Sequence, residues 1–185
     1  MTSDFYAKLA AVRRRIHAHP EISENEFETT AFLKEYISKL GIRILETDLP
    51  TGFIAEIGHG KPVIALRADI DALPIKEKNT FDYASQNGAM HACGHDFHQT
   101  SLLGAAEILK AKEEQLKGTV RLIFQPAEEV SVGAYQVIEN GGLKDVSAII
   151  GYHNYPHLKP GEIGLRSKAI MAAVDKFKVT VSGVS

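Results

Sequence analysis

The sequence predicts an α/β protein built on a mixed, mostly parallel sheet with helices on both faces. Three observations support this fold class. Two segments with helical spacing open the chain, short apolar runs typical of strands follow, and strong helical segments lie between the later runs. Such alternation is typical of a sheet that carries helices on its faces. With 185 residues, 44% of them hydrophobic and 24% charged, the chain can form one compact domain.

The two opening helices are expected over residues 4–19 and 26–40. The first stops at Pro20, and the second ends before Gly41, a typical residue after a last helical turn. The tail alternates like a half-buried strand over residues 177–181 and then reaches a Ser-Gly turn signal. Between them we expect strands at 53–57, 63–68, 120–124 and 146–152, and helices at 97–112 and about 134–140.

Composition and charge exclude several classes of partner. The formal net charge is −2, and no basic stripe interleaves with aromatic residues, so we expect no nucleic acid partner. Asp4 and Lys8 interrupt the N-terminus where a signal peptide needs an apolar run, and no apolar stretch approaches membrane-spanning length. One cysteine cannot form an internal disulfide. These features favour a cytoplasmic protein that does not bind a membrane.

An unusual concentration of metal-binding residue types occurs in "NGAMHACGHDFHQT", residues 87–100. Within eight consecutive positions this stretch holds His91, Cys93, His95, Asp96 and His98, in a chain with one cysteine and eight histidines. The stretch leads directly into the helix expected from residue 97. The partial positive charge at a helix N-terminus favours thiolate over thiol, so we expect this position to activate the cysteine.

Acidic residues or histidine follow three of the expected strands. Asp69 and Asp71 follow one strand, Glu128 and Glu129 another, and His153 the third. In open α/β sheets, sites gather at the carboxyl ends of the strands. Thiolate, imidazole and carboxylate that meet at one edge indicate a transition-metal site.

Each of these residues also has a purely structural interpretation. A lone cysteine is often a small buried hydrophobe, the two aspartates could form a turn, and the two glutamates could stabilise the first turn of the next helix. A single histidine after a strand is usually an ordinary loop residue. His17 and His19 are expected to interact with the last carbonyls of the first helix. Agreement among four separate segments favours the metal site over these readings.

Five motifs resemble a known family. They are "LRADIDALPI", "MHACGHDFHQTSLLGAA", "GTVRLIFQPAEE", "GYHNYPHLKPGEI" and "MAAVDKFKVTVSG". In this order and at these separations they resemble the M20 metallopeptidase-like amidohydrolases, within them the branch of hippurate hydrolases, N-acyl-amino-acid deacylases and auxin-conjugate hydrolases. The resemblance implies a zinc-peptidase-like catalytic domain. It also implies small-molecule N-acyl amino acid substrates, which are hydrolysed to an amino acid and a carboxylate.

The same resemblance implies roles for individual residues. Glu128 becomes the general base, and Asp71 orients a ligating imidazole. Two divalent transition metal ions are implied for a complete site, and zinc, manganese, nickel or cobalt would suit the mixed donors. The implied metal ligands are Cys93, His95, Glu129 and His153.

The resemblance further implies that residues 1–185 are the first segment of the catalytic metal-binding domain. A lid or dimerisation domain and a C-terminal catalytic segment, with a further histidine ligand, would lie outside them. We therefore expect little deacylase activity from these residues alone, and possible self-association through an uncovered part of the sheet. Two alternatives stay open. One is a non-catalytic remnant that binds metal without turnover, and the other is a hydrolase that uses Cys93 as its nucleophile.

Overall fold

The computed structural model describes the chain except for residues 1, 174, 176, 184 and 185. These residues divide into two compact units, Met1–Asn154 and Tyr155–Ser185. All the helices and strands assigned within the described residues belong to the first unit. No described helix is both long enough and apolar enough to cross a membrane.

The first unit is a five-stranded sheet with strand order β1-β2-β4-β3-β5. Its helices are α1 (Ser3–Ala18), α2 (Phe27–Lys39), α3 (His95–Lys110) and α4 (Gly133–Glu139), with a short 3-10 turn, η1 (Glu113–Gln115). Its strands are β1 (Arg43–Ile44), β2 (Phe53–Gly58), β3 (Val63–Asp69), β4 (Thr119–Gln125) and β5 (Val146–Gly151).

The sheet is mixed, as the sequence predicts. β3 runs parallel to both β4 and β5, whereas β2 pairs antiparallel with β4 and with β1. Asp69 at the end of β3 pairs with Gln125 at the end of β4, and Arg67 pairs with Gly151 at the end of β5. The carboxyl ends of these three strands therefore meet at one edge of the sheet.

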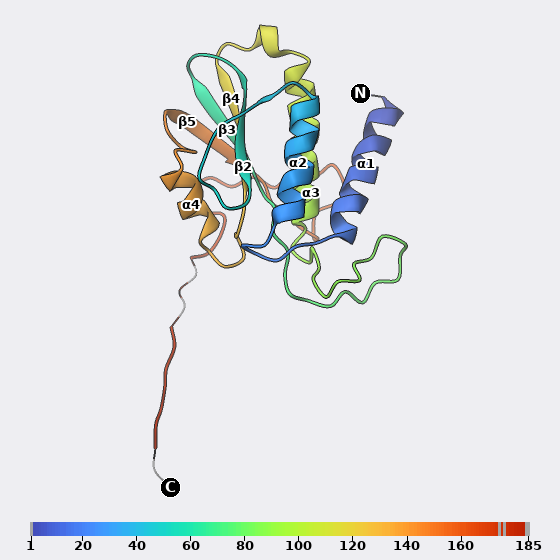
Figure 1. Cartoon of the computed structure of the whole chain (residues 1–185), viewed down its shortest axis with the longest axis vertical. Helices are drawn as coiled ribbons and strands as arrows, with labels where there is room; N and C mark the ends of the chain where they lie inside the picture. Colours follow the sequence, from blue (N-terminus) through green and yellow to red (C-terminus); the bar gives the residue numbers. More distant parts are fainter. Residues whose placement is uncertain (1, 174, 176, 184–185) are drawn as a thin grey trace. The chain divides into compact units, whose positions relative to one another are not determined.

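Helices cover both faces of the sheet (Figure 1). α1, α2 and α3 lie on one face, where their apolar side chains form the main core with the sheet, and α4 lies on the other. Phe53 of β2 and Phe124 of β4 stack in the main core with ring centroids 4.5 Å apart, and both are fully buried. Val137 of α4 packs against Ala65 and Ile123 on the opposite face. The predicted arrangement of helices on both faces is confirmed.

The tail differs from the sequence prediction. The described residues among 177–183 carry no strand. Val184 and Ser185, just past the Ser-Gly turn signal, lie outside the described residues. A strand needs a neighbouring strand to satisfy its backbone hydrogen-bonding groups, and the part of unit Tyr155–Ser185 that the structure describes contains none. Alternating apolar residues alone therefore do not form a strand here.

Candidate metal centre

The Cys93 loop leads into α3 through a glycine that the local geometry requires. Gly94 has φ +91°, in the left-handed region that favours glycine. A Cβ at this position would lie 2.4 Å from the side-chain oxygen of Asn154. The glycine thus turns the chain into the helix and lets the segment after β5 approach closely. His95 consequently occupies the first turn of α3, beside the edge where the parallel strands end.

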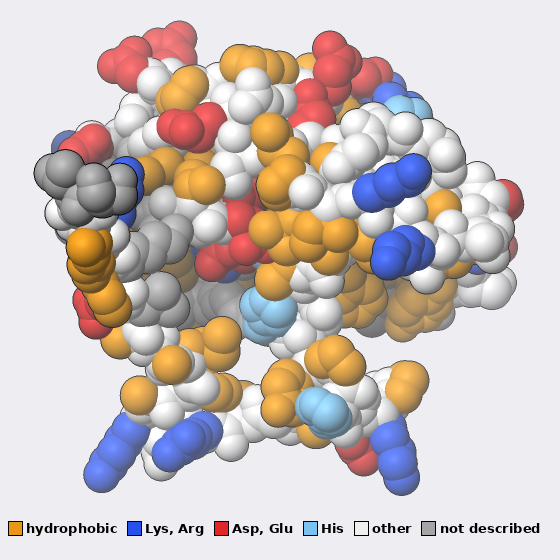
Figure 2. Space-filling view, turned by 90° about the horizontal axis from the view of Figure 1, so that it is seen from below, with side chains coloured by type: hydrophobic (Ala, Val, Ile, Leu, Met, Phe, Trp, Pro, Cys, Tyr) orange, Lys and Arg blue, Asp and Glu red, His pale blue; other side chains and the backbone are white. Residues whose placement is uncertain are grey.

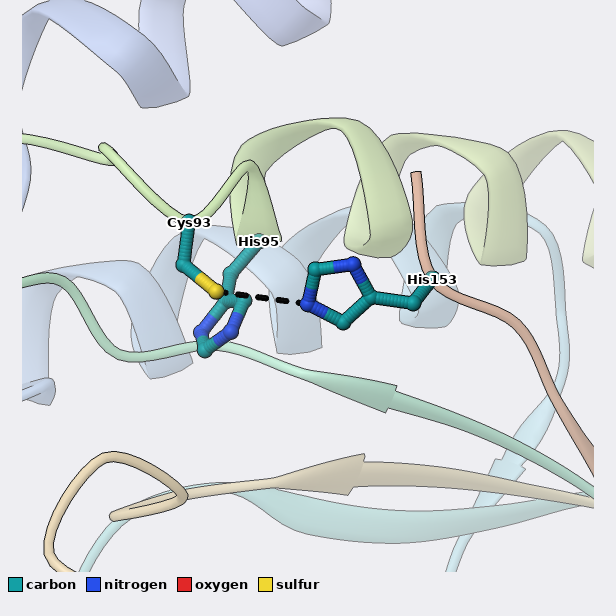
Figure 3. A group of neighbouring side chains, drawn as sticks. All are labelled: Cys93, His95 and His153. Carbon is teal, nitrogen blue, oxygen red and sulfur yellow. Dashed lines mark hydrogen bonds between the residues drawn. The ribbon is translucent and has the colours of Figure 1, made fainter. Parts of the chain in front are cut away.

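Three side chains from separate parts of the chain converge here. The ligand atoms of Cys93, His95 and His153 lie within 4.8 Å of one another. The Sγ of Cys93 is 3.2 Å from Nε2 of His153, and His95 lies beside them (Figure 3). The structure therefore brings these three implied ligands together, and the fourth, Glu129, lies close to His95.

Asp71 fixes the orientation of His95. Nδ1 of His95 lies 2.9 Å from the backbone oxygen of Asp71 and 3.2 Å from its Oδ1. The other carboxylate oxygen accepts hydrogen bonds from the Ser23 hydroxyl at 2.6 Å and from the Glu129 backbone N–H at 3.0 Å. With Nδ1 donating to Asp71, the lone pair of His95 is on Nε2, which faces the cluster.

The two adjacent glutamates also reach this point. Glu128 Oε2 and Glu129 Oε1 each lie 3.7 Å from Nε2 of His95. Their exposure differs, because the side chain of Glu128 is 40% exposed and that of Glu129 is 19% exposed. Glu129 is therefore the better enclosed of the two, while Glu128 is open to solvent and to any bound molecule.

A tight loop after β4 presents these glutamates. Ala127 has φ +47°, and its backbone N–H donates a 2.8 Å hydrogen bond to the buried carboxylate of Glu26. A Cβ on Gly133 would lie 1.6 Å from the backbone oxygen of Pro126. The chain can fold back this sharply only because residue 133 has no side chain.

The electrostatics of Cys93 differ from the sequence expectation. Burial raises the pKa of its thiol to about 12, and the carboxylates of Glu129 and Glu128 add to the rise. The helix N-terminus was expected to favour thiolate, but the nearby negative charges and burial outweigh that partial charge. A bound cation would reverse this balance, since metal coordination deprotonates a thiol.

The raised pKa values of two neighbouring groups also reflect an excess of negative charge. Burial opposes protonation of His95, yet its hydrogen bond to Asp71 and the charge of Asp69 raise its pKa overall. Burial raises the pKa of Glu129, and the charges of Glu128 and Asp71 raise it further. Carboxylates held this close together create a site that attracts a cation.

The unsatisfied polar atoms fit a metal ion. Among the described residues, Nε2 of His95 and Oε1 of Glu129 are buried without a hydrogen-bond partner. Buried polar atoms are nearly always paired, so such atoms facing one point are consistent with an ion there. Thiolate, imidazole and carboxylate are donors that first-row transition metals accept. Viewed from below in Figure 2, acidic side chains gather in a recess bordered by hydrophobic side chains.

Two further residues join the site without a role from sequence reasoning. Asp69 and His98 form a second possible ligand group with His95. Oδ1 of Asp69 is 2.7 Å from Nδ1 of His98. Their spacing in sequence gives no hint of this contact, because it depends on how α3 lies against β3.

His91 and Asp96 belong to none of the candidate ligand groups among the described residues. Both ring nitrogens of His91 are buried with no hydrogen-bond partner in the part of the chain described, and burial lowers its pKa to about 4. Asp96 accepts a 2.7 Å hydrogen bond from His17. His17 therefore does not interact with helix carbonyls as expected, whereas Nδ1 of His19 does, at 2.8 Å from the backbone oxygen of Arg15.

A mixed α/β sheet with thiol, imidazole and carboxylate groups at its carboxyl edge is typical of metal-dependent hydrolases. The chain belongs to peptidase family M20/M25/M40, and its residues 65–183 match that family.

The relatives include deacetylases and plant hydrolases. An N-acetyl-L-cysteine deacetylase of Bacillus subtilis (strain 168) is 54% identical over 179 residues, which cover 95% of this chain and 43% of the relative. The IAA-amino acid hydrolase ILR1-like 5 of Arabidopsis thaliana is 45% identical and is matched over 97% of this chain and 42% of its own length. The chain thus spans less than half the length of these relatives.

A solved structure agrees with the fold. The Bacillus subtilis YXEP protein, described as a dinuclear metal binding peptidase from the M20 family, matches with a TM-score of 0.82 and 50% identity. The match covers 85% of this chain and 45% of that protein. Human carnosine dipeptidase 1, at 18% identity and a TM-score of 0.60, shares the fold over 82% of this chain and 38% of its own.

Proposed function

We propose that residues 1–185 are the first segment of the catalytic domain of a metal-dependent amidohydrolase. The enzyme hydrolyses N-acyl amino acids, such as N-acetyl or N-benzoyl amino acids, to an amino acid and a carboxylate. One observation carries the proposal: Cys93, His95 and His153 present ligand atoms within 4.8 Å of one another at the carboxyl edge of the sheet. The names of the relatives, an N-acetyl-L-cysteine deacetylase and an IAA-amino acid hydrolase, support the substrate class.

The proposed ligands hold a divalent transition metal, and a complete site holds two. Zinc, manganese, nickel and cobalt all accept the mixed donor set. The similarity to a dinuclear metal binding peptidase supports a paired site. The proposed ligand residues are Cys93, His95, Glu129 and His153.

The proposed chemistry divides the work between the two glutamates. When bound, the metal polarises the amide carbonyl and lowers the pKa of water. Glu128, the more exposed carboxylate, accepts the proton of the attacking water and delivers it to the leaving nitrogen. Glu129 binds the metal. Asp71 holds Nδ1 of His95 and so keeps Nε2 directed at the site.

Three variants test this division of roles. In a full-length protein that carries this segment in place of the matching half of the Bacillus subtilis deacetylase, Glu128→Gln should keep the metal and lose roughly 10²- to 10⁴-fold in kcat, because only the proton acceptor is removed. Glu129→Gln should weaken metal binding as well. The double variant Cys93→Ala, His95→Ala should lose the metal. Metal analysis after purification without chelator, together with hydrolysis of N-acetyl amino acids, gives both readouts.

A matched control is His59→Ala, an exposed histidine between β2 and β3, which should change neither metal content nor rate. Equal metal content in the wild type and the double variant would overturn the ligand assignment. If Glu128→Gln and Glu129→Gln both kept metal and activity, the assignment of roles would be wrong.

A second candidate function is metal binding without turnover by these 185 residues. The exposure of His153 and Glu128 favours it, because catalysis needs a site that excludes water. Little hydrolysis by the 185-residue chain with added Mn²⁺ or Zn²⁺, beside turnover by the full-length protein, is the expected pattern. A Cys93 nucleophile would instead give activity that survives EDTA and is lost with iodoacetamide; the raised thiol pKa disfavours it.

A further inference from the structure

We propose that Asp69 and His98 are positioning residues, which hold the backbone after β5 against α3 and thereby place His153 in the metal site. The inference rests on the proposed function, since it concerns a proposed ligand. It assigns a role to two buried residues that contact each other and that the proposed reaction does not otherwise use.

The contacts form a continuous chain from the end of β3 to the residue after His153. Nδ1 of His98 lies 2.7 Å from Oδ1 of Asp69, and the backbone N–H of Asn154 donates to Nε2 of His98 at 3.1 Å. Since Nε2 accepts a hydrogen bond, the ring proton is on Nδ1 and is donated to Asp69. Both ring nitrogens of His98 are therefore engaged, which makes it a support for the site rather than a metal ligand.

Asp69, where this series of contacts begins, is firmly held. Asp69 and His98 are each 1% exposed. The second carboxylate oxygen of Asp69 accepts a 2.7 Å hydrogen bond from Arg67. Burial opposes ionisation of Asp69, but His98 and Arg67 together lower its pKa well below the usual range. Asp69 also ends β3, so this series of contacts begins on a strand that is paired on both sides.

His153, in contrast, is exposed and depends on its surroundings for its place. Its own Nδ1 lies 2.8 Å from the backbone oxygen of Asn154, and its ring meets the ring of His98 edge-on, with centroids 4.7 Å apart. The side chain of Asn154 lies where a side chain on residue 94 would be. Two contacts with the start of α3 thus hold Asn154, the residue next to His153. One is its backbone hydrogen bond to His98, and the other is the contact of its side chain with Gly94.

Two variants of His98 in the 185-residue chain test the proposal. His98→Ala removes both hydrogen bonds, whereas His98→Gln can donate its amide N–H to Asp69 and accept from Asn154 with its oxygen. The alanine variant should increase hydrogen exchange of the Asn154 amide at least tenfold. It should also weaken Co²⁺ binding by about 10- to 100-fold, the usual effect of removing a group that orients a ligand. The glutamine variant should recover most of both losses.

NMR of the wild type should show the His98 proton on Nδ1. Tyr152→Phe is the control, because it removes hydrogen bonds to Ser101 and Phe97 from the same segment but leaves the Asp69–His98 contact intact. It should change exchange at Asn154 and Co²⁺ affinity far less than His98→Ala does. Protection of the Leu103 amide in the core of α3 verifies that each variant is folded.

The outcomes separate this proposal from the proposed function. If the wild-type chain binds no Co²⁺, the metal assignment fails, and exchange at Asn154 alone decides whether His98 holds this segment. Rapid exchange at Asn154 in the wild type, or equal exchange in wild type and His98→Ala, would overturn the positioning role. Undiminished Co²⁺ affinity in a folded His98→Ala variant would overturn its link to the metal site.

Discussion

At the scale of single residues, the partners of the two ring nitrogens separate the histidines of this chain. His95 donates through Nδ1 to Asp71 and keeps Nε2 free, as a metal ligand requires. His98 uses both nitrogens and supports a neighbouring segment. His17 contacts two carboxylates with its two nitrogens. Sequence spacing cannot distinguish these cases, because the partners come from distant segments.

Residue types and strand ends indicated a metal site, but the family resemblance supplied the ligand set Cys93, His95, Glu129 and His153. The family resemblance supplied the division of roles between Glu128 and Glu129. The contact of Asp69 with His98 could not be predicted, since it depends on the packing of α3 on β3. The helix N-terminus was expected to favour the thiolate of Cys93, whereas burial, together with carboxylates from another loop, raises the pKa of the thiol.

His17 should titrate above its ordinary pKa. The hydrogen bond to Asp96 raises its pKa most, burial and the charge of Arg13 oppose the rise, and Glu77 adds to it. Asp96 and Glu77 have lowered pKa values, because their hydrogen bonds to His17 outweigh the burial that opposes their ionisation. NMR titration should therefore give His17 a pKa above about 6.5, and Asp96→Asn should lower it.

The sign of the resulting pH dependence follows from this raised pKa. The contribution of protonated His17 to the free energy of unfolding is full below its unfolded pKa of about 6.5 and is lost as the pH rises through the folded value. Urea unfolding between pH 5 and 9 should show this loss in the wild type and less of it in His17→Gln. His59→Gln, on an exposed loop, is the control. A His17 pKa at or below 6.5 would contradict the prediction.

At the scale of elements, periodicity and end signals predicted the longer helices and strands to within about two residues, the usual uncertainty of element ends. β1 was missed because two residues carry no period, and its place depends on pairing with β2. The tail strand was wrongly predicted because alternation indicates a strand only where a partner exists. The prediction was therefore limited by the lack of information about which strands pair, more than by the local pattern.

The buried carboxylate of Glu26 connects the start of α2 with two loops, one before β2 and one after β4. Glu26, 0% exposed at the start of α2, accepts hydrogen bonds from the Thr51 hydroxyl at 2.7 Å and from the Ala127 N–H at 2.8 Å. Glu26→Ala would leave both donors unpaired, at about 1–3 kcal/mol each. The free energy of unfolding measured in urea should therefore fall by roughly 2–6 kcal/mol.

The exposed Glu28 on the same helix supplies the matched control. Glu28→Ala should change stability by less than about 0.5 kcal/mol, as is usual for surface positions. A loss in Glu26→Ala no greater than in Glu28→Ala would show that neither buried hydrogen bond contributes. The loop that carries the two site glutamates would then need another support.

At the scale of the whole molecule, β5 forms an exposed edge strand of the sheet. β5 pairs with β3 on one side, and no described strand pairs with its other side. Ile149 is 50% exposed and Ile150 is 59% exposed along this strand. An exposed apolar edge strand presents unpaired N–H and C=O groups, to which another chain can add. The sheet that gathers the site residues thus also offers a surface for association.

We therefore expect the 185-residue chain to self-associate through β5. Sedimentation velocity should show the mean mass rising with protein concentration, and Ile150→Lys should reduce that rise, because a charge on an edge strand opposes strand addition. Ile163→Lys is the control, since Ile163 is 83% exposed but lies outside any strand. If both variants reduced association equally, general hydrophobic contact would be the cause. A monomer at every concentration would show that the exposed edge of β5 does not recruit a second chain.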